Sequence, residues 1–330
     1  MTEQSAYNSR QRNIFLDVAK SIAIILVIVG HEFMYHSGME TLPFRVIYSF
    51  HMAFFMFISG MVFSIKFKAL PSPDFKTSRE IMKSARGLLV PFVSWTLIYA
   101  FTEHRDSVLQ YLLSVVESPD NSLWFLLVLF WCRIFFVTVH EVCIKCFGKP
   151  SVISLVSVMI VIFGLVSVAS KLLLPRNFLG CELFRTFFPH FAAGVFMYQY
   201  RESLSGFLDS ISVNTIMIII FILTAPFYYN VSPNPFETAH GEFLFKIIIR
   251  IPAIPGIFLM MSLTKFITRA NFKPITNALS FTGKMTMGIY VFHWYFLKMF
   301  PPFIVPFLAS IVITVIVEKI PLLRSLLLGK

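Results

Sequence analysis

Long apolar runs separated by short polar connections recur along almost the whole chain. A membrane-crossing α-helix needs about 20 mostly apolar residues, and these runs approach or reach that length. The runs occupy residues 14–33, 46–67, 87–102, 123–142, 151–174, 184–200, 212–229, 243–264, 280–299 and 302–320. This pattern predicts an all-α, polytopic membrane protein with about ten transmembrane helices.

The connections between these runs are too short to hold a separate soluble domain. Residues 68–80 and 230–242 contain proline with serine or asparagine, which is typical of turns. The sequence therefore predicts one integral membrane domain over residues 1–330. The eighth run contains RIPAIPG at residues 250–256, which predicts a kinked or broken helix. Such breaks can line a cavity, but many membrane helices tolerate proline without one.

Composition supports a membrane protein and argues against a nucleic-acid partner. Hydrophobic residues make up 57% of the chain, charged residues only 14%, and the mean hydropathy is +0.76. Soluble domains contain about 25% charged residues. The net charge of +11 would suit nucleic acid if the cations covered a water-facing surface. Here they flank apolar runs instead, so the expected surroundings are membrane lipids.

Successive connections between the apolar runs alternately contain many and few lysine and arginine residues. With the amino terminus inside, the connection after the second run carries Lys66, Lys68, Lys76, Arg79, Lys83 and Arg86. The outer segments carry only Arg45, Arg105, Lys171, Arg176 and Lys298. Positive charge collects on the cytoplasmic side of membrane proteins, so both termini are expected there. No small-residue cleavage site follows the first run, which is expected to be a retained helix.

The four cysteines do not predict a metal or redox site. Cys143 and Cys146 have CxxC spacing, but neither a second ligand pair nor a thioredoxin-like context accompanies them. We therefore expect no metal.

The first run, DVAKSIAIILVIVGH at residues 17–31, is apolar between two polar ends. Lys20 and His31 are eleven positions apart, which is about 16 Å along an α-helix and within about 20° of the same direction. Asp17, three residues before Lys20, can contact it on the helix surface. In the simplest structural interpretation, Lys20 extends to the inner headgroups and His31 reaches the outer interface.

Other polar side chains are predicted at similar depths in other runs. The outer halves hold His51, His190 and His293, and the inner side holds Lys20, Arg86 and Lys284, with Arg133 deeper. One charge at the centre of a membrane costs about 2.5–3.5 kcal/mol on insertion scales, so several together indicate a polar interior. Each histidine alone is more often a hydrogen-bonded packing residue than a catalyst.

These features together resemble the acyltransferase-3 family of membrane O-acyltransferases. The carrying residues are Leu16-Asp17, Lys20 and Gly30-His31, with IYSFHMAFFMFISGMVF (47–63), RGLLVPFVSW (86–95), SLWFLLVLF (122–130) and GIYVFH (288–293). The resemblance implies transfer of an acyl group from cytoplasmic acyl-CoA to an extracytoplasmic acceptor. The family's basic residue, which precedes its histidine with ten residues in between, falls on Lys20. It is often arginine, and lysine lacks arginine's two-pronged phosphate geometry.

The resemblance assigns roles to both ends of the first helix. Lys20, with Asp17, Arg86 and Lys284 as further donor-side candidates, would hold the acyl-CoA phosphates by charge-assisted contacts. His31 would act as a general base on the acceptor hydroxyl, since imidazole titrates near neutral pH. It could instead carry the acyl group covalently, and the sequence leaves both routes open. Acetyl-CoA is the expected co-substrate, with no permanently bound cofactor.

Further candidates surround these two ends. Glu32, His51 and His293 are candidates for orienting His31. The acceptor-side candidates are Trp124, Arg185, Lys246 and Arg250. Trp124 also suits an aromatic-belt anchor, and the three cations suit ion pairs within the bundle equally well.

The sequence therefore predicts an O-acyltransferase, in the simplest case an O-acetyltransferase, of a bacterial inner membrane. Its acceptor would be a surface glycan or a lipid-linked saccharide. A transporter or flippase for lipid-linked glycans would also suit ten spans, a kinked eighth helix and buried cations. A non-catalytic scaffold is the third possibility, and it would tolerate apolar residues in place of Lys20 and His31.

Overall fold

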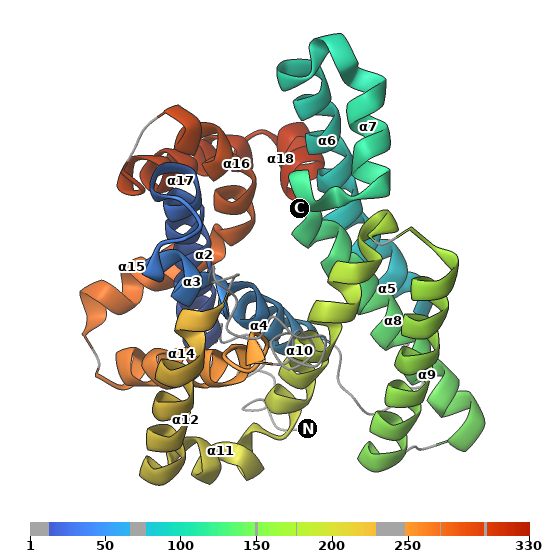
Figure 1. The fold of residues 1–330 in the computed structure, drawn as a ribbon, viewed down its shortest axis with the longest axis vertical. Helices are drawn as coiled ribbons and strands as arrows, with labels where there is room; N and C mark the ends of the chain where they lie inside the picture. The colour runs from blue at the N-terminus through green and yellow to red at the C-terminus, as the bar shows by residue number, and fades with distance from the viewer. Residues whose placement is uncertain are drawn as a thin grey trace, which may run out of the picture. The chain divides into compact units, whose positions relative to one another are not determined.

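The computed structural model describes residues 13–66, 77–148, 151–175, 177–228, 248–270, 272–299 and 302–330. Within these ranges every regular element is a helix and none is a strand (Figure 1), which confirms the all-α prediction. Five helical segments are long and apolar enough to cross a membrane: Ile14–Ser37, Leu42–Ile65, Thr77–Glu103, Trp124–Phe147 and Val152–Leu173. Two shorter apolar helices, Ile211–Phe227 and Ile304–Glu318, follow. The described residues thus show a polytopic helical chain without reaching the predicted count of ten.

The helices group into two compact units. The first comprises residues 1–58 and 202–311, and the second comprises residues 59–201 and 312–330. Neither unit is one continuous stretch of sequence, because the chain leaves each unit and returns to it. The expected single domain over residues 1–330 stays a prediction.

Helix α2 (Ile14–Glu32) is the centre of the first unit. The Asn13 side chain caps its start by accepting a hydrogen bond from the Leu16 backbone N–H at 3.3 Å. Four helices pack against it: α3 (Leu42–Tyr48), α14 (Ala253–Arg269), α15 (Lys273–Lys284) and α16 (Thr286–Met299). The other helices of this part of the chain are the start of α4 (His51–Lys66), α11 (Arg201–Asp209), α12 (Ile211–Thr224) and most of α17 (Ile304–Glu318). Because α2 is surrounded, its polar side chains must find partners inside the unit.

A glycine allows α15 to touch the first turn of α2. A Cβ atom at Gly283 would lie 2.0 Å from the backbone oxygen of Asp17. One turn away, the buried Ser21 hydroxyl donates to the Leu279 carbonyl. This contact brings the end of α15 directly against the part of α2 that carries Asp17 and Lys20.

The second unit is built around α8 (Trp124–Phe147). Its other helices are the rest of α4, α5 (Thr77–Ser84), α6 (Val90–Glu103), α7 (Val108–Glu117), α9 (Val152–Leu173), α10 (Cys181–Gln199) and α18 (Pro321–Leu328). Short 3₁₀ turns lie at Arg105–Ser107, Pro119–Asn121, Phe178–Gly180 and, in the first unit, Ala225–Phe227. Phenylalanine rings from three helices fill its core, with Phe135 on α8 meeting Phe163 on α9 and Phe188 on α10 at 6.0 and 4.7 Å between ring centroids.

Several helices have boundaries that differ from the predicted runs. The second run divides into α3 and α4 at a turn over residues 49–50, and the third starts earlier, at Thr77, and passes through a π-helical turn η2 (Ala85–Leu89). The ninth starts at Lys273 and breaks at Met285, where the Thr286 hydroxyl donates to the Gly283 carbonyl at 2.8 Å. A side chain that binds a helix-end carbonyl competes with the helical ladder, and hydropathy alone does not detect it. The predicted break at residues 250–256 is confirmed, since α14 begins only at Ala253 after a turn.

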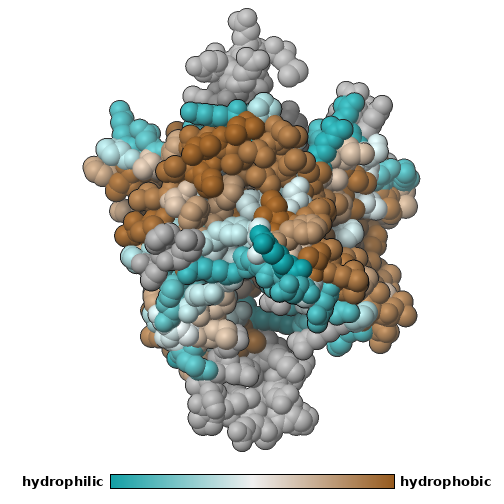
Figure 2. All heavy atoms as spheres, turned by 90° about the horizontal axis from the view of Figure 1, so that it is seen from above, coloured by the Kyte–Doolittle hydropathy of each residue, from teal (hydrophilic) through white to brown (hydrophobic). Residues whose placement is uncertain are grey.

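The exposed surface is strongly apolar on the side seen in Figure 2, where brown side chains form broad areas. Helix α9 is the clearest case, since its apolar side chains are largely exposed, from Ile153 at 79% to Leu173 at 80%. A helix that is apolar all round and also exposed is unfavourable in water but is suited to lipid. The exterior therefore agrees with an integral membrane protein.

Candidate active site

His31 lies in the last turn of α2 and pairs with a second histidine. Its Nδ1 is 2.9 Å from Nε2 of His293 on α16. The two rings are stacked, with centroids 5.2 Å apart and planes 14° from parallel. His293 is only 1% exposed, whereas His31 is half-buried. Two residues 262 positions apart thus meet through the packing of α16 on α2.

The hydrogen bonds of His293 determine which nitrogens carry protons. Its Nδ1 lies 2.7 Å from the Tyr290 carbonyl oxygen and 3.1 Å from that of Ile289. A carbonyl can only accept, so Nδ1 of His293 carries the hydrogen, and in the neutral ring Nε2 has the lone pair. His31 Nδ1 must therefore donate to His293. This leaves the lone pair of neutral His31 on Nε2, where a general base or nucleophile needs it.

Aromatic rings enclose this pair. Trp294 meets His31 edge-on, with centroids 5.2 Å apart and planes at 82°. Tyr48 lies at the end of α3, and its ring centroid is 6.3 Å from that of His31. The Tyr48 ring stacks on Phe44, with centroids 3.9 Å apart. A Cβ atom at Gly30 would lie 3.1 Å from Cε2 of Tyr48, so a larger residue at this position would make a tight contact with the Tyr48 ring. Tyr48 and Trp294 were not selected from the sequence, although each lies within three residues of a selected histidine.

His51 opens α4 on the other side of Tyr48, with ring centroids 4.6 Å apart. Its Nδ1–H donates to the Ile47 carbonyl at 2.9 Å, which puts the lone pair on Nε2. The residue is 1% exposed, and Nε2 is buried with no hydrogen-bond partner in the described part of the chain. Among the described residues, the group that contacts Nδ1 of His31 is therefore His293, not His51 or Glu32.

Helix α2 changes its winding immediately after this site. Residues Phe33–Ser37 form a π-helical turn, η1. Such turns are rare and frequently occur at functional sites. Glu32, the last α-helical residue, has one carboxylate oxygen, Oε2, that is buried and unpaired within the described ranges.

The amino-terminal turns of α2 carry the predicted ion pair. Lys20 Nζ lies 2.7 Å from Oδ1 of Asp17, which confirms the predicted contact, and Asp17 is only 3% exposed. Lys284 follows Gly283 at the end of α15 and is exposed, so it lies next to this turn of α2.

The helix between the two ends is regular, but it is covered. Because α2 is α-helical from Ile14 to Glu32, Lys20 and His31 are separated by about 16 Å, as the spacing predicts. On the stripe between them, Ala23, Ile24 and Val27 are completely buried. A molecule that extends from Lys20 to His31 along this stripe must therefore displace packed side chains.

The remaining candidates do not gather around His31 within the first unit. Arg86, Trp124, Arg185 and His190 all belong to the second unit. Arg86 lies in η2, and Trp124 begins α8, where its ring stacks on that of Phe187 with centroids 5.2 Å apart. Arg185 on α10 donates to the Ser170 hydroxyl at 2.8 Å. Arg250 is exposed in the turn before α14, and Lys246 lies outside the described residues. The residues that the structure describes contain no group of three or more histidine, cysteine, aspartate or glutamate side chains that could hold a metal ion.

Comparison with known proteins identifies the kind of molecule to which this site belongs. Residues 13–318 match the acyltransferase-3 family, whose description is "Acyltransferase domain". The chain belongs to the acyltransferase-3 family. It is also similar to the nodulation protein NolL of Mesorhizobium japonicum, with 30% identity over 129 residues, which is 36% of this chain and 33% of that protein. The match thus spans about a third of the relative's length, and no solved structure matches.

Membership in the acyltransferase-3 family confirms the resemblance that the sequence motifs indicated. The matched range includes both ends of α2 and the His31–His293 pair. Acyl transfer needs a base or nucleophile with an available lone pair, and the hydrogen bonds leave one on His31 Nε2. In this acyltransferase-3 chain, that nitrogen is the group best placed to do chemistry.

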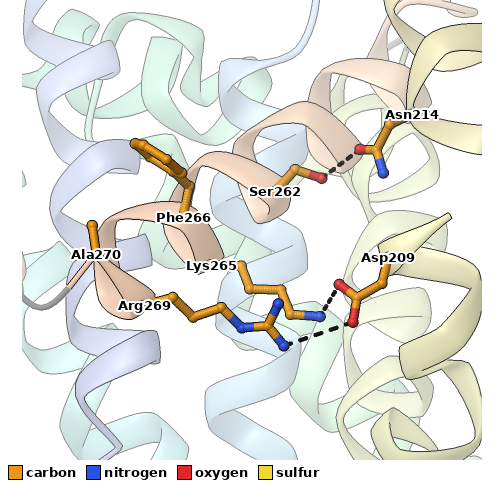
Figure 3. Close-up of a pocket in the computed structure, with 7 residues that line it drawn as sticks. All are labelled: Asp209, Asn214, Ser262, Lys265, Phe266, Arg269 and Ala270. Atoms are coloured by element: carbon orange, nitrogen blue, oxygen red, sulfur yellow. Dashed lines mark hydrogen bonds and ion pairs between the residues drawn. The ribbon is translucent and has the colours of Figure 1, made fainter. Parts of the chain in front are cut away.

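A second feature of the first unit is a pocket of about 440 Å³ between α11, α12 and α14 (Figure 3). Asp209 accepts from Lys265 and lies 3.7 Å from Nη2 of Arg269, and the Ser262 hydroxyl donates to Asn214 Oδ1 at 2.9 Å. The hydrogen bond from Lys265 lowers the pKa of Asp209. Because the folded pKa is depressed, the pair persists at pH values where an ordinary carboxylate starts to protonate. The charged groups that line this pocket pair with one another, so we interpret them as a structural link between α11 and α14 in this acyltransferase-3 fold.

Proposed function

We propose that this protein moves an acyl group, in the simplest case acetyl, from cytoplasmic acyl-CoA to a hydroxyl group outside a bacterial inner membrane. The acceptor would be a surface glycan or a lipid-linked saccharide. The observation that supports this most directly is the His31–His293 pair, which leaves an unengaged imidazole lone pair at the predicted outer end of α2. Family membership supplies the reaction class.

The proposed transfer uses His31 Nε2 twice. Nε2 takes the proton of the acceptor hydroxyl while its oxygen attacks the thioester carbonyl, and the resulting imidazolium returns that proton to the departing CoA thiolate. During the step, the Nδ1–H of His31 points at the lone pair of His293 at 2.9 Å. A hydrogen bond from a cationic donor is stronger than one from a neutral donor, so His293 stabilises the imidazolium and holds its orientation.

A covalent route uses the same nitrogen. Nε2 of His31 would attack the thioester carbonyl first and expel CoA as its thiolate, which leaves an acyl group on the imidazolium ring. The acceptor hydroxyl would then attack that acyl carbonyl, the bond from carbon to Nε2 would break, and the hydroxyl proton would pass to Nε2 and then to the thiolate. Both routes require His31 neutral with the hydrogen on Nδ1, which is the state that the contact with His293 selects.

The donor end is proposed at the Asp17–Lys20 pair. Lys20 supplies a cation for the CoA phosphates, and Asp17 holds it at 2.7 Å. The exposed Lys284 on the adjacent end of α15 adds a second cation. Because Ala23, Ile24 and Val27 are covered, the pantetheine arm needs a rearrangement of the helices packed on α2 before it can extend to His31. Donor binding is therefore expected to be coupled to a helix movement.

The proposal is tested with the purified chain in lipid nanodiscs, radiolabelled acetyl-CoA and a bacterial surface polysaccharide from which esters have been removed by alkali. We expect label to enter the polysaccharide as an alkali-labile ester. A flippase would instead move fluorescent lipid-linked glycan across vesicles that contain no acyl donor. Translocation without ester formation would reject transfer in favour of transport, and a chain that does neither would fit the scaffold.

Replacing Lys20 with glutamine should weaken donor binding more than it slows transfer. Charge-assisted hydrogen bonds contribute about 1.5–3 kcal/mol, so the KM for acetyl-CoA should rise about 10- to 100-fold. Lys20→Arg, which retains the charge, should remain close to wild type. Lys20→Gln removes the cation beside the buried Asp17, so the double variant Asp17→Asn/Lys20→Gln controls for loss of stability. Lys273→Gln, which removes an exposed cation elsewhere on α15, controls for the loss of a positive charge. A KM that changes neither in Lys20→Gln nor in the double variant would remove Lys20 from the donor site.

A further inference from the structure

The pocket between α11, α12 and α14 has an excess of positive charge. Lys265 donates to Oδ1 of Asp209, and Nη2 of Arg269 lies 3.7 Å from Oδ2 of the same carboxylate. One carboxylate therefore faces two cations, both of which extend toward it from α14 (Figure 3). The Arg269 contact is longer than a hydrogen bond, and the Arg269 side chain is 68% exposed. Its N–H groups can therefore donate to a ligand that carries negative charge.

The pocket has room for such a ligand. Its volume of about 440 Å³ lies in the range of pockets that hold small molecules, and it is many times larger than one water molecule. Ser262, Lys265 and Arg269 line it from one face of α14, since they are three or four residues apart. Asp209 at the end of α11 and Asn214 in the first turn of α12 line it from the opposite side (Figure 3). A ligand in this space would contact three helices.

The surroundings of the pocket are apolar and exposed. Phe266, which lines the pocket, is 70% exposed, and Ile211, two residues after Asp209, is 84% exposed. Helix α12 is strongly apolar, yet none of its residues is buried. Exposed apolar side chains of this kind suit acyl chains and are unfavourable in water. A basic pocket between helices that borders such a surface has the properties of a lipid head-group site.

The predicted topology places this pocket on the cytoplasmic side. Asp209 lies in the connection after the sixth apolar run, and Lys265 and Arg269 lie in the connection after the eighth. With the amino terminus inside, both connections are expected inside. Their contact through the Asp209–Lys265 pair agrees with segments on one side of a membrane. Anionic lipids give the cytoplasmic leaflet its negative surface potential, so an anionic head group is the favoured occupant there.

We propose that this pocket binds the head group of an anionic glycerophospholipid. Arg269 and Lys265 hold the phosphate diester by charge-assisted hydrogen bonds, and the Lys265 ammonium has further hydrogens besides the one on Asp209. Phe266 packs against the start of the acyl chains. Because Asp209 also lines the pocket, a head group with hydroxyl hydrogens, such as phosphatidylglycerol, fits better than one with a second anionic group. The lipid links α11 and α12 to α14, which packs on α2.

The test measures lipid binding by the full chain in neutral detergent, without an acyl donor. Delipidated protein is titrated with phosphatidylglycerol or with phosphatidylethanolamine of the same acyl chains, and bound lipid is measured by native mass spectrometry. We expect phosphatidylglycerol to bind at least about 10-fold more tightly and to raise the thermal unfolding midpoint, because a ligand of the folded state stabilises it. Arg269→Gln should weaken this binding about 10- to 100-fold, since charge-assisted hydrogen bonds are lost. Arg269→Lys, which keeps the charge, should lie between the two.

Two controls make the result specific. Lys273→Gln removes an exposed cation four residues after Arg269 that does not line the pocket, so it should bind phosphatidylglycerol like wild type. Without lipid, Arg269→Gln should unfold at the wild-type temperature, because the Arg269 side chain is largely exposed.

Several outcomes would overturn the inference. One is equal affinity for the two lipids, and another is the same loss of affinity in Arg269→Gln and Lys273→Gln. Displacement of phosphatidylglycerol by equal concentrations of inorganic phosphate or CoA would identify a site for soluble phosphates instead. A lower unfolding midpoint of Arg269→Gln without lipid, together with unchanged lipid affinity, would leave Arg269 with a structural role only. None of these readouts depends on acyl transfer.

Discussion

Replacing His31 with alanine is expected to lower acyl transfer by about 10²- to 10⁴-fold, the usual contribution of a positioned general base. The His31–His293 contact leaves the lone pair of His31 on Nε2, where a base needs it. A covalent route predicts a loss at least as large, because no acyl-imidazole can form. The rate is measured as alkali-labile ester formed from radiolabelled acetyl-CoA.

Two further variants make this result specific. His36→Ala removes a histidine from the exposed π-helical turn only five positions away and should leave the rate close to wild type. His31→Gln keeps a side chain that can donate to His293 but cannot take up the proton, so it should be as inactive as alanine. Full activity in His31→Ala with an intact melting transition would remove His31 from the chemistry.

The second large effect is expected at Gly283, on the stability of the protein. Gly283→Ala places a methyl group 2.0 Å from the Asp17 carbonyl oxygen, which is a backbone atom and cannot rotate away. Inserting atoms into a packed contact costs about 1–3 kcal/mol. The thermal unfolding midpoint of the protein in detergent should therefore fall. Because the same contact positions the Asp17–Lys20 turn against α15, the KM for acetyl-CoA should rise as well.

Helix α9 provides the matched control. A Cβ atom at Gly164 meets no other atom within 4 Å, and alanine is favoured over glycine inside a helix by about 0.5–1 kcal/mol. Gly164→Ala should therefore maintain or raise the unfolding midpoint. Equal midpoints for Gly283→Ala and wild type would mean that α15 and α2 are not packed as closely as the structure shows.

In the proposed mechanism, His293 orients the imidazole of His31. In many enzymes a carboxylate orients the catalytic imidazole, whereas here a neutral imidazole has that position, with its own Nδ1–H bound to the Tyr290 carbonyl at 2.7 Å. A neutral orienting group avoids placing a permanent charge among the aromatic rings of Tyr48 and Trp294. It stabilises the imidazolium by one hydrogen bond and without full charge neutralisation.

Helical periodicity was sufficient for features that lie within one helix. The contact of Asp17 with Lys20, the regular spacing from Lys20 to His31 and the break before Ala253 all follow from residues close in sequence, and the structure has each of them. The breaks at residues 49–50 and at Met285 were not predicted, because apolar residues continue through both. Backbone hydrogen bonds from His51 and Thr286 side chains accompany these breaks, and hydropathy does not register them.

By itself, the sequence determined that this chain is helical, that it suits lipid, and that a cation and a histidine lie on one side of its first helix, since hydropathy and the rise and rotation per residue are local properties. Only the tertiary structure decided which of several histidines meets His31, which of its nitrogens is left with the lone pair, and that Nε2 of His51 is buried without a hydrogen-bond partner in the described chain. Periodicity specifies the face of a helix, but the helix that packs against that face depends on contacts between residues hundreds of positions apart.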